Sequence, residues 1–146
     1  MLIQDHKLAW RWTDQAHAVL PDEVLAQMYP ANLSEAQALH KRSMTLLGRD
    51  GLRSEFSAAI VCTEEFSSQA GTKWLSQQHP QSDQPVFLSW DQESALRTNW
   101  GVFTSYWQEF CYPVSDDLVV FPESEAWVLL YHHKEEFHFG TRAVNT

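Results

Sequence analysis

An aromatic stripe late in the chain limits most strongly what this sequence can fold into. Four large aromatic side chains recur at spacings of three, four and three residues: Trp100, Phe103, Trp107 and Phe110. Residues with these spacings lie on one face of an α-helix. Asp91 is of a type that caps helix N-termini, so the sequence predicts a long helix from about residue 92 to residue 111. Because an aromatic side chain buries roughly 150–250 Å², we expect the stripe to point into the core.

The whole chain is rich in aromatic residues, with seven Trp, eight Phe and four Tyr among 146 residues. A chain of this length buries roughly 68–70% of the surface that its unfolded state exposes, which is enough for one hydrophobic core. We therefore expect a single domain over residues 1–146. Core packing is the first explanation for the aromatic excess, and a platform on which a ring-shaped ligand stacks is the alternative.

Strand patterns gather around and after the predicted aromatic helix. Short apolar runs bounded by turn residues occur at residues 85–90, 117–121, 127–132 and 137–140. Helical patterns occur earlier, at residues 20–30, 34–47 and 67–80. This order predicts an α+β fold, in which an antiparallel sheet of about four to five strands carries helices mainly on one face.

Local signals set the expected limits of the early elements. Residues 8–12 alternate in a way that predicts a short strand. Ser34 is expected to begin the following helix and Gly48 to end it. Residues 49–66 are compatible with a strand or with a buried helix, because a short apolar run has no decisive period.

The negative charge of the chain is uneven. The formal net charge is −9, and residues 91–140 hold nine acidic residues but only two basic ones, Arg97 and Lys134. Such a surface repels phosphate backbones, so we expect no binding to nucleic acid. It can attract a basic protein partner and speed the encounter. The alternative is that the charge only keeps the protein dissolved.

The sequence gives no sign of export or of a membrane. Cys62 and Cys111 are the only cysteines and are far apart. The N-terminus has no uninterrupted apolar stretch of signal-peptide length, and no apolar run is long enough to span a bilayer. We expect a cytoplasmic protein with two reduced thiols. It is a monomer or a homodimer, and a dimer is expected to bury aromatic surface at Trp127 or Tyr131.

No short motif of catalysis is present. The chain lacks a glycine-rich phosphate loop, a nucleophile elbow, paired CxxC motifs and HExxH, and it has only five glycines. No spacing of Ser, His and Asp singles out a triad. We therefore lean against an enzyme, assign no catalytic residue and expect no cofactor.

A histidine-rich segment near the end is the best candidate for a ligand site. It holds, in chain order, His132, His133, Glu135, Glu136 and His138. Two imidazoles and one carboxylate suit zinc or another transition metal. Half-exposed histidines on a polar sheet face, with no ligand, are the simpler alternative.

The length of the hairpin turn decides which of these side chains meet. A two-residue turn at residues 134–135 makes His133 face Glu136 and puts His133, Glu136 and His138 on one sheet face. This trio is the predicted metal or small-molecule site. A turn one residue longer pairs His132 with His138 instead, and the trio then disperses.

Four acidic residues form a second candidate site. They flank the predicted strands as Asp116, Asp117, Glu123 and Glu125. Loops at the ends of neighbouring strands lie close together, so these carboxylates are expected to form an acidic docking surface for a basic partner. The alternative is that Asp116 and Asp117 are turn residues that begin a strand.

Several segments together resemble a known family. They are WRW near the start, LPDEVLAQMYP, PVFLSW, TNWGVFTSYWQEF, the Asp116-Asp117 pair and a final strand that ends in FHFG. The chain resembles, from about Lys7 to Gly140, the bacterial family catalogued as domain of unknown function 2947. The resemblance implies a small bacterial cytosolic domain and brings no catalytic or ligand residues with it.

These observations favour a non-enzymatic binding protein. The most concrete form is an inhibitor resembling a toxin-immunity protein, whose acidic loops cover the basic rim of a partner's active site. The alternative is a metal-binding or small-molecule-binding domain, or a hydrolase, with its site at His133, Glu136 and His138.

Overall fold

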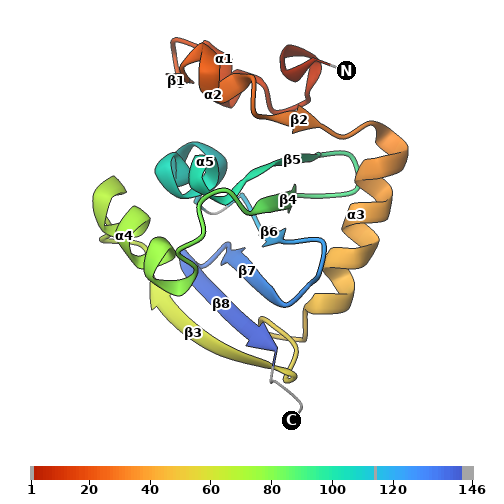
Figure 1. The fold of residues 1–146 in the computed structure, drawn as a ribbon, viewed down its shortest axis with the longest axis vertical. Coiled ribbons are helices and arrows are strands. Elements are labelled where there is room, and N and C mark those ends of the chain that lie inside the picture. The colour runs from red at the N-terminus through yellow and green to blue at the C-terminus, as the bar shows by residue number, and fades with distance from the viewer. Residues whose placement is uncertain (1, 114, 143–146) are drawn as a thin grey trace.

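A seven-stranded antiparallel sheet organises the molecule (Figure 1). The computed structural model describes residues 2–113 and 115–142. Neighbouring strands are antiparallel throughout the sheet. In spatial order the strands are β2 (Tyr29–Pro30), β5 (Ala95–Asn99), β4 (Pro85–Ser89), β6 (Leu118–Phe121), β7 (Trp127–His132), β8 (Glu136–Arg142) and β3 (Phe56–Cys62). The α+β class and the antiparallel sheet are confirmed, whereas the predicted four to five strands are too few.

Three strands account for this difference. β3 lies in the segment that was compatible with a strand or a helix, and all seven of its residues pair with β8. β2 has only two residues, and the pairing of Tyr29 and Pro30 with β5 makes them a strand. β5 falls inside the segment predicted as a long helix. In each case a neighbouring strand, rather than a local pattern, determines the conformation.

The predicted long helix over residues 92–111 is therefore wrong. Its first part forms a hairpin with β4, and the helical part is split into α5 (Trp100–Ser105) and α6 (Trp107–Phe110). Asn99, not Asp91, caps α5, because its side chain accepts a hydrogen bond from the N–H of Val102 at 2.8 Å. The expected burial of the stripe is confirmed, since all four aromatic side chains are in the core.

One face of the sheet carries most of the helices. These are α1 (Trp10–Thr13), α2 (Asp22–Leu25), α4 (Ser68–Gln78), α5 and α6. They contribute Trp12, Val24, Leu75, Phe103 and Trp107 to one hydrophobic cluster. Trp127, Tyr131, Phe137 and Phe139 enter the same cluster from β7 and β8. Because Trp127 and Tyr131 are buried within the chain, the homodimer expected at these two residues is not supported.

In the part of the chain that the structure describes, one helix, α3 (Leu33–Leu46), covers the other face (Figure 1). Ala36, Leu39 and Leu46 pack there against alternate residues of the strands, such as Val119 and Leu130. The helix begins one residue before the predicted Ser34, because Asn32 and Glu35 form the capping box.

The N-terminal segment was predicted as a short strand at residues 8–12, and this is wrong. A 3-10 turn, η1 (Ile3–Asp5), precedes α1, and β1 (Ala18–Val19) folds back onto the end of α1. Tertiary contacts hold this segment: the indole Nε1 of Trp12 donates to the carbonyl oxygen of Glu109 at 2.9 Å. The alternation in the sequence therefore reflects aromatic residues in a helical turn.

Candidate metal centre

A pocket of about 400 Å³ lies between the second half of α3, the loop that follows it and the adjoining ends of β6 and β7. The groups on its wall that can bind a ligand are His40, Met44, Arg49, Asp117, His132 and His133. Asp117 directly precedes β6, and His132 is the last residue of β7. The pocket thus gathers residues from three distant parts of the chain.

The hairpin between β7 and β8 sets which histidines reach this pocket. His132 pairs with Glu136, so three residues, 133–135, form the connection. Glu135 has a positive φ of 61°, and its N–H donates to the carbonyl oxygen of His132 at 2.9 Å. This is a three-residue hairpin loop, in which the last loop residue has a left-handed backbone conformation. The predicted two-residue turn is therefore wrong, and His133 does not face Glu136.

His133 instead contacts Asp117, on the neighbouring strand. Its Nδ1 lies 2.9 Å from Oδ1 and 3.2 Å from Oδ2 of Asp117, and its backbone N–H donates to Oδ1 at 2.9 Å. Partial burial opposes ionisation of Asp117, but these bonds from His133 outweigh it and lower the pKa of the carboxyl group. Without a metal, the ionised carboxylate accepts the Nδ1 proton. Nδ1 is the nitrogen of His133 that lies close to Asp117, so an ion that binds both residues displaces this proton.

His132 completes a group of three possible ligands. One ligand atom from each of Asp117, His132 and His133 can be chosen so that all lie within 4.8 Å of one another. The rings of His132 and His133 stack with centroids 4.2 Å apart. Burial, followed by the neighbouring His133, lowers the pKa of His132, which keeps this imidazole neutral. The N–H of Lys134 donates to its Nδ1 at a long 3.2 Å.

The other two predicted ligands lie next to this group. Nε2 of His138 is 3.1 Å from Oε1 of Glu136, and the His138 ring stacks beside His132 with centroids 5.8 Å apart. His138 is buried beneath the loop at Gly51, where an added Cβ would lie 2.8 Å from its Nδ1. The structure therefore brings Glu136 and His138 together and directs His133 to Asp117.

The sequence pattern did not predict that Asp117 and His132 lie beside His133. Asp117 is 16 residues away and was placed in the acidic docking site. Only the pairing of β6 with β7 brings it beside His133. The strand pattern did contain a signal for this contact. When two successive strands are antiparallel and joined by a short connection, the start of the first lies beside the end of the second.

Two of the four predicted docking residues have partners within the chain that limit such a role. Asp116 is buried and forms an ion pair with Arg11 at 2.7 Å. Glu125 is only partly exposed and accepts a hydrogen bond from Nε of Arg42 at 2.9 Å.

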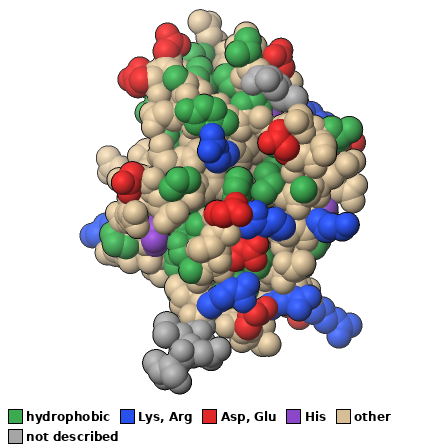
Figure 2. Space-filling model, turned by 45° about the vertical axis from the view of Figure 1, so that its right-hand side comes forward, with side chains coloured by type: hydrophobic (Ala, Val, Ile, Leu, Met, Phe, Trp, Pro, Cys, Tyr) green, Lys and Arg blue, Asp and Glu red, His purple; other side chains and the backbone are tan. Residues whose placement is uncertain are grey.

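Glu123 also contacts Arg42, at 3.2 Å, but its side chain is 78% exposed. In the lower half of the face shown in Figure 2, acidic and basic side chains lie next to one another. The acidic residues are thus interspersed with basic ones there.

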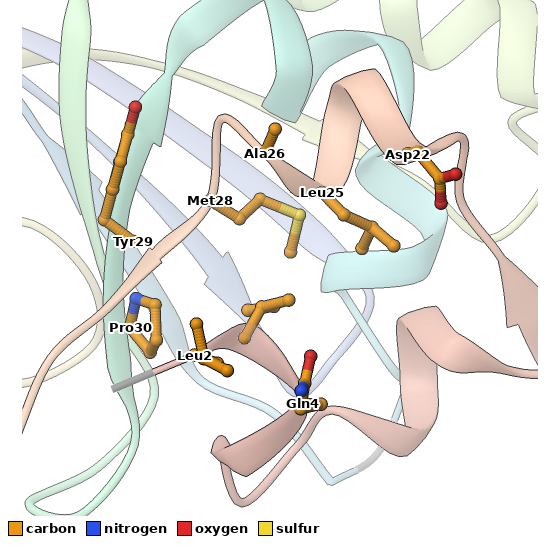
Figure 3. Close-up of a pocket in the computed structure, with 9 residues that line it drawn as sticks. Leu2, Gln4, Asp22, Leu25, Ala26, Met28, Tyr29 and Pro30 are labelled. Carbon is orange, nitrogen blue, oxygen red and sulfur yellow. The ribbon is translucent and has the colours of Figure 1, made fainter.

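A larger pocket of about 580 Å³ lies beside η1, α2 and β2 (Figure 3). Its walls are mainly apolar and include Leu2, Leu25 and Met28. Asp22 is the one charged side chain among the described residues that line it. It has no convergent set of ionisable groups, so the histidine pocket is the better equipped site for chemistry.

The helices in the described part of the chain include none with both the length and the apolar character that crossing a bilayer requires. The resemblance to domain of unknown function 2947 stays a prediction. Comparisons of the chain with family models, with curated proteins and with solved structures found no match.

Proposed function

We propose that this protein binds a divalent transition-metal ion through Asp117, His132 and His133. The observation that carries the proposal is that ligand atoms of these three side chains lie within 4.8 Å of one another on the wall of a pocket. Two imidazoles with one carboxylate form a donor set that zinc and non-haem iron use in proteins. The proposal modifies the predicted site, because it keeps His133 but replaces Glu136 and His138 by Asp117 and His132.

The protonation states of the ligands support this proposal. A metal competes with protons, so ligands that are already deprotonated bind it better. The pKa of Asp117 is lowered by its bonds to His133, which outweigh its partial burial, and the pKa of His132 is lowered mainly by burial. Both side chains are therefore in the metal-binding form at neutral pH. On binding, His132 gives up its long bond to the N–H of Lys134.

The pocket supports an open metal site. Three protein ligands leave at least one coordination position of a tetrahedral ion for water or a small molecule. Arg49 and His40 line the same pocket and favour an anionic ligand at the open position of the metal. A metal held in this way would supply Lewis-acid chemistry toward a carbonyl or phosphoryl oxygen.

Titration calorimetry with zinc chloride, on protein purified without a histidine tag, tests the proposal. One zinc ion per chain is expected. Its affinity should fall in His132→Ala and in Asp117→Asn by more than the roughly 10–100-fold that follows loss of a group that only orients a ligand. His17→Ala is the matched control, since His17 is an exposed histidine outside the pocket. Equal weak binding by all four proteins would contradict the proposal.

His138→Ala separates this site from the one predicted by the sequence. His138 lies beside His132 but its Nε2 is engaged with Glu136. We expect this variant to keep stoichiometric zinc. Loss of zinc in His138→Ala with retention in Asp117→Asn would instead support the trio of His133, Glu136 and His138.

The inhibitor-like function stays a prediction. Its support is the net charge of −9, and Glu123 has the most exposed side chain of the four acidic residues. A pull-down from bacterial lysate with the wild type and with Glu123→Lys checks it. A basic partner held by the wild type alone would support it, and a partner held equally by both proteins would count against the acidic surface.

A further inference from the structure

The histidine pocket has a polar and an apolar part. Besides the three proposed metal ligands, its polar lining includes His40 and Arg49. The apolar lining includes Met44, Leu47, Trp90 and Leu130. Small-molecule sites in proteins combine apolar walls with a few polar groups that orient the ligand. At about 400 Å³ this pocket has the size and the lining of such a site.

A tight turn that begins at Gly48 and ends at Gly51 holds Arg49 on the wall of the pocket. The N–H of Gly48 donates to the carbonyl oxygen of Gly51 at 2.7 Å. Gly51 lies against the ring of His138, which stacks beside His132. The turn therefore rests on the histidine group and fixes the backbone of Arg49 there.

The guanidinium of Arg49 is exposed and available to a ligand. Within residues 2–113 and 115–142 it has no ion-pair partner, whereas Arg11 and Arg42 are each paired with carboxylates. Arginine binds carboxylate oxygens through charge-assisted hydrogen bonds of well-defined geometry. An organic acid that enters the pocket can use this group.

The apolar lining is accessible and partly fixed in place. Met44 is 46% exposed although it lies in α3, and its flexible thioether adapts to apolar groups of different shapes. Trp90 is half-buried, and its indole Nε1 donates to the carbonyl oxygen of Phe110 at 3.0 Å, which fixes the ring. An organic body that covers these side chains removes apolar surface from water.

We propose that the ligand at the open metal position is a small organic carboxylate with an apolar body, such as an aromatic acid. This inference rests on the proposed metal site. One carboxylate oxygen completes the coordination of the ion, and the other accepts hydrogen bonds from Arg49. The apolar body packs on Met44 and Trp90.

Phosphate fits this pocket less well than a carboxylate. A phosphoryl group brings at least three strong acceptor oxygens. The metal and Arg49 satisfy both oxygens of a carboxylate, whereas a further oxygen that faces Met44 or Leu130 loses its bonds to water without replacement. The lining therefore favours an acid with few oxygens and an apolar body.

Titration calorimetry of the zinc-loaded protein with sodium benzoate tests the ligand class. We expect one benzoate per chain, bound about 10–100-fold more tightly than acetate, because the two share the carboxylate and differ in the buried ring. Sodium phosphate is expected to bind more weakly than benzoate. Metal-free protein is expected to bind benzoate more weakly by about tenfold or more.

Arg49→Gln tests the contact with the carboxylate. We expect benzoate affinity to fall about tenfold and zinc affinity to stay equal or rise slightly, since the positive charge of Arg49 repels the ion. Arg53→Gln is the matched control, because Arg53 is an exposed arginine of the same loop outside the described lining of the pocket. It should keep both affinities.

Met44→Ala tests the contact with the apolar body. It is expected to weaken benzoate about fivefold and to leave acetate unchanged. Leu33→Ala is the control, since Leu33 is 57% exposed at the other end of α3.

The outcomes separate this inference from the metal site. Zinc binding with equal affinities for benzoate and acetate, or with phosphate bound more tightly than benzoate, would overturn the ligand class and leave the metal site standing. Unchanged benzoate affinity in Arg49→Gln would overturn the role of Arg49. A protein that binds no zinc would overturn both the metal site and the inference.

Discussion

Arg11 and Asp116, which are 105 residues apart in the chain, form a buried ion pair with two hydrogen bonds of 2.7 and 3.1 Å. The guanidinium also lies over the ring of Tyr112, 4.0 Å from its centroid. The N–H of Tyr112 donates to Oδ2 of Asp116 at 2.8 Å. This group joins α1 to the segment that leads into β6. Asp116 thus holds the fold together, in a place where the sequence suggested a docking residue.

Removing one partner of this pair is expected to destabilise the protein strongly. Asp116→Ala leaves the charge of Arg11 buried without a partner, which costs about 3–5 kcal/mol of unfolding free energy. The measurement is urea denaturation at neutral pH. Glu93→Ala is the control, because it breaks the exposed pair with Lys7 and should cost less than about 1 kcal/mol. Similar losses in both variants would show that the Arg11 pair contributes no more than a surface pair.

The stability of the protein is expected to fall in mild acid because of His6. Leu8 N–H donates to Nδ1 of His6, and Nε2 lies 3.1 Å from the carbonyl oxygen of Ala95, so the neutral ring satisfies both contacts. Burial is the main cause that lowers the pKa of His6 below 6.5. The unfolded chain therefore binds a proton more readily than the folded one. The contribution of His6 is fully present above pH 6.5 and is lost as the pH falls from there toward the lowered pKa.

Urea denaturation at several pH values below neutral checks this prediction. His6→Gln is expected to be less stable than the wild type at neutral pH and to show a shallower loss in acid. His17→Gln, which changes an exposed histidine, should keep the slope of the wild type. An unchanged slope in His6→Gln would mean that other groups cause the acid sensitivity.

Gly71→Ala is expected to destabilise the protein, although alanine favours helices. A Cβ at this position of α4 would overlap with the ring of Trp107. The indole cannot move freely, because its Nε1 donates to the carbonyl oxygen of Ser68 at 2.9 Å. Overpacking of this kind costs about 1–3 kcal/mol, more than the gain of about 1 kcal/mol in helix propensity. Thermal unfolding measures the net effect, and Ser76→Ala on the exposed face of α4 is the control. A more stable Gly71→Ala would show that α4 moves away at little cost.

Glu135→Gly is expected to stabilise the protein by about 0.5–1 kcal/mol. Glu135 has a φ of 61°, a conformation that costs energy for residues with a Cβ and none for glycine. Glu125 has a similar φ of 56°, but its carboxylate accepts a bond from Arg42. Glu125→Gly should therefore bring no net gain. Urea midpoints of the two variants test the difference, and a loss of stability in Glu135→Gly would contradict the prediction.

Local sequence signals predicted the helices and strands in which the residue pattern and the tertiary contacts favour the same conformation. The helix at residues 67–80 appears as α4, and the runs at residues 85–90 and 127–132 appear as β4 and β7. The pattern failed at residues 92–111, where Leu96 has the spacing of the aromatic stripe but lies in β5. Hairpin pairing with β4 there supplies backbone hydrogen bonds that the helical pattern does not predict.

The sequence by itself determined the composition of the core and the class of the fold. Burial of the aromatic stripe follows from the apolar character of its residues, which needs no knowledge of their partners. Tertiary structure alone decided the candidate site. Asp117, His132 and His133 meet because β6 pairs with β7 and because a left-handed Glu135 lengthens the hairpin by one residue. Such a change reassigns every cross-strand contact near the turn, since side chains alternate between the two faces of a strand.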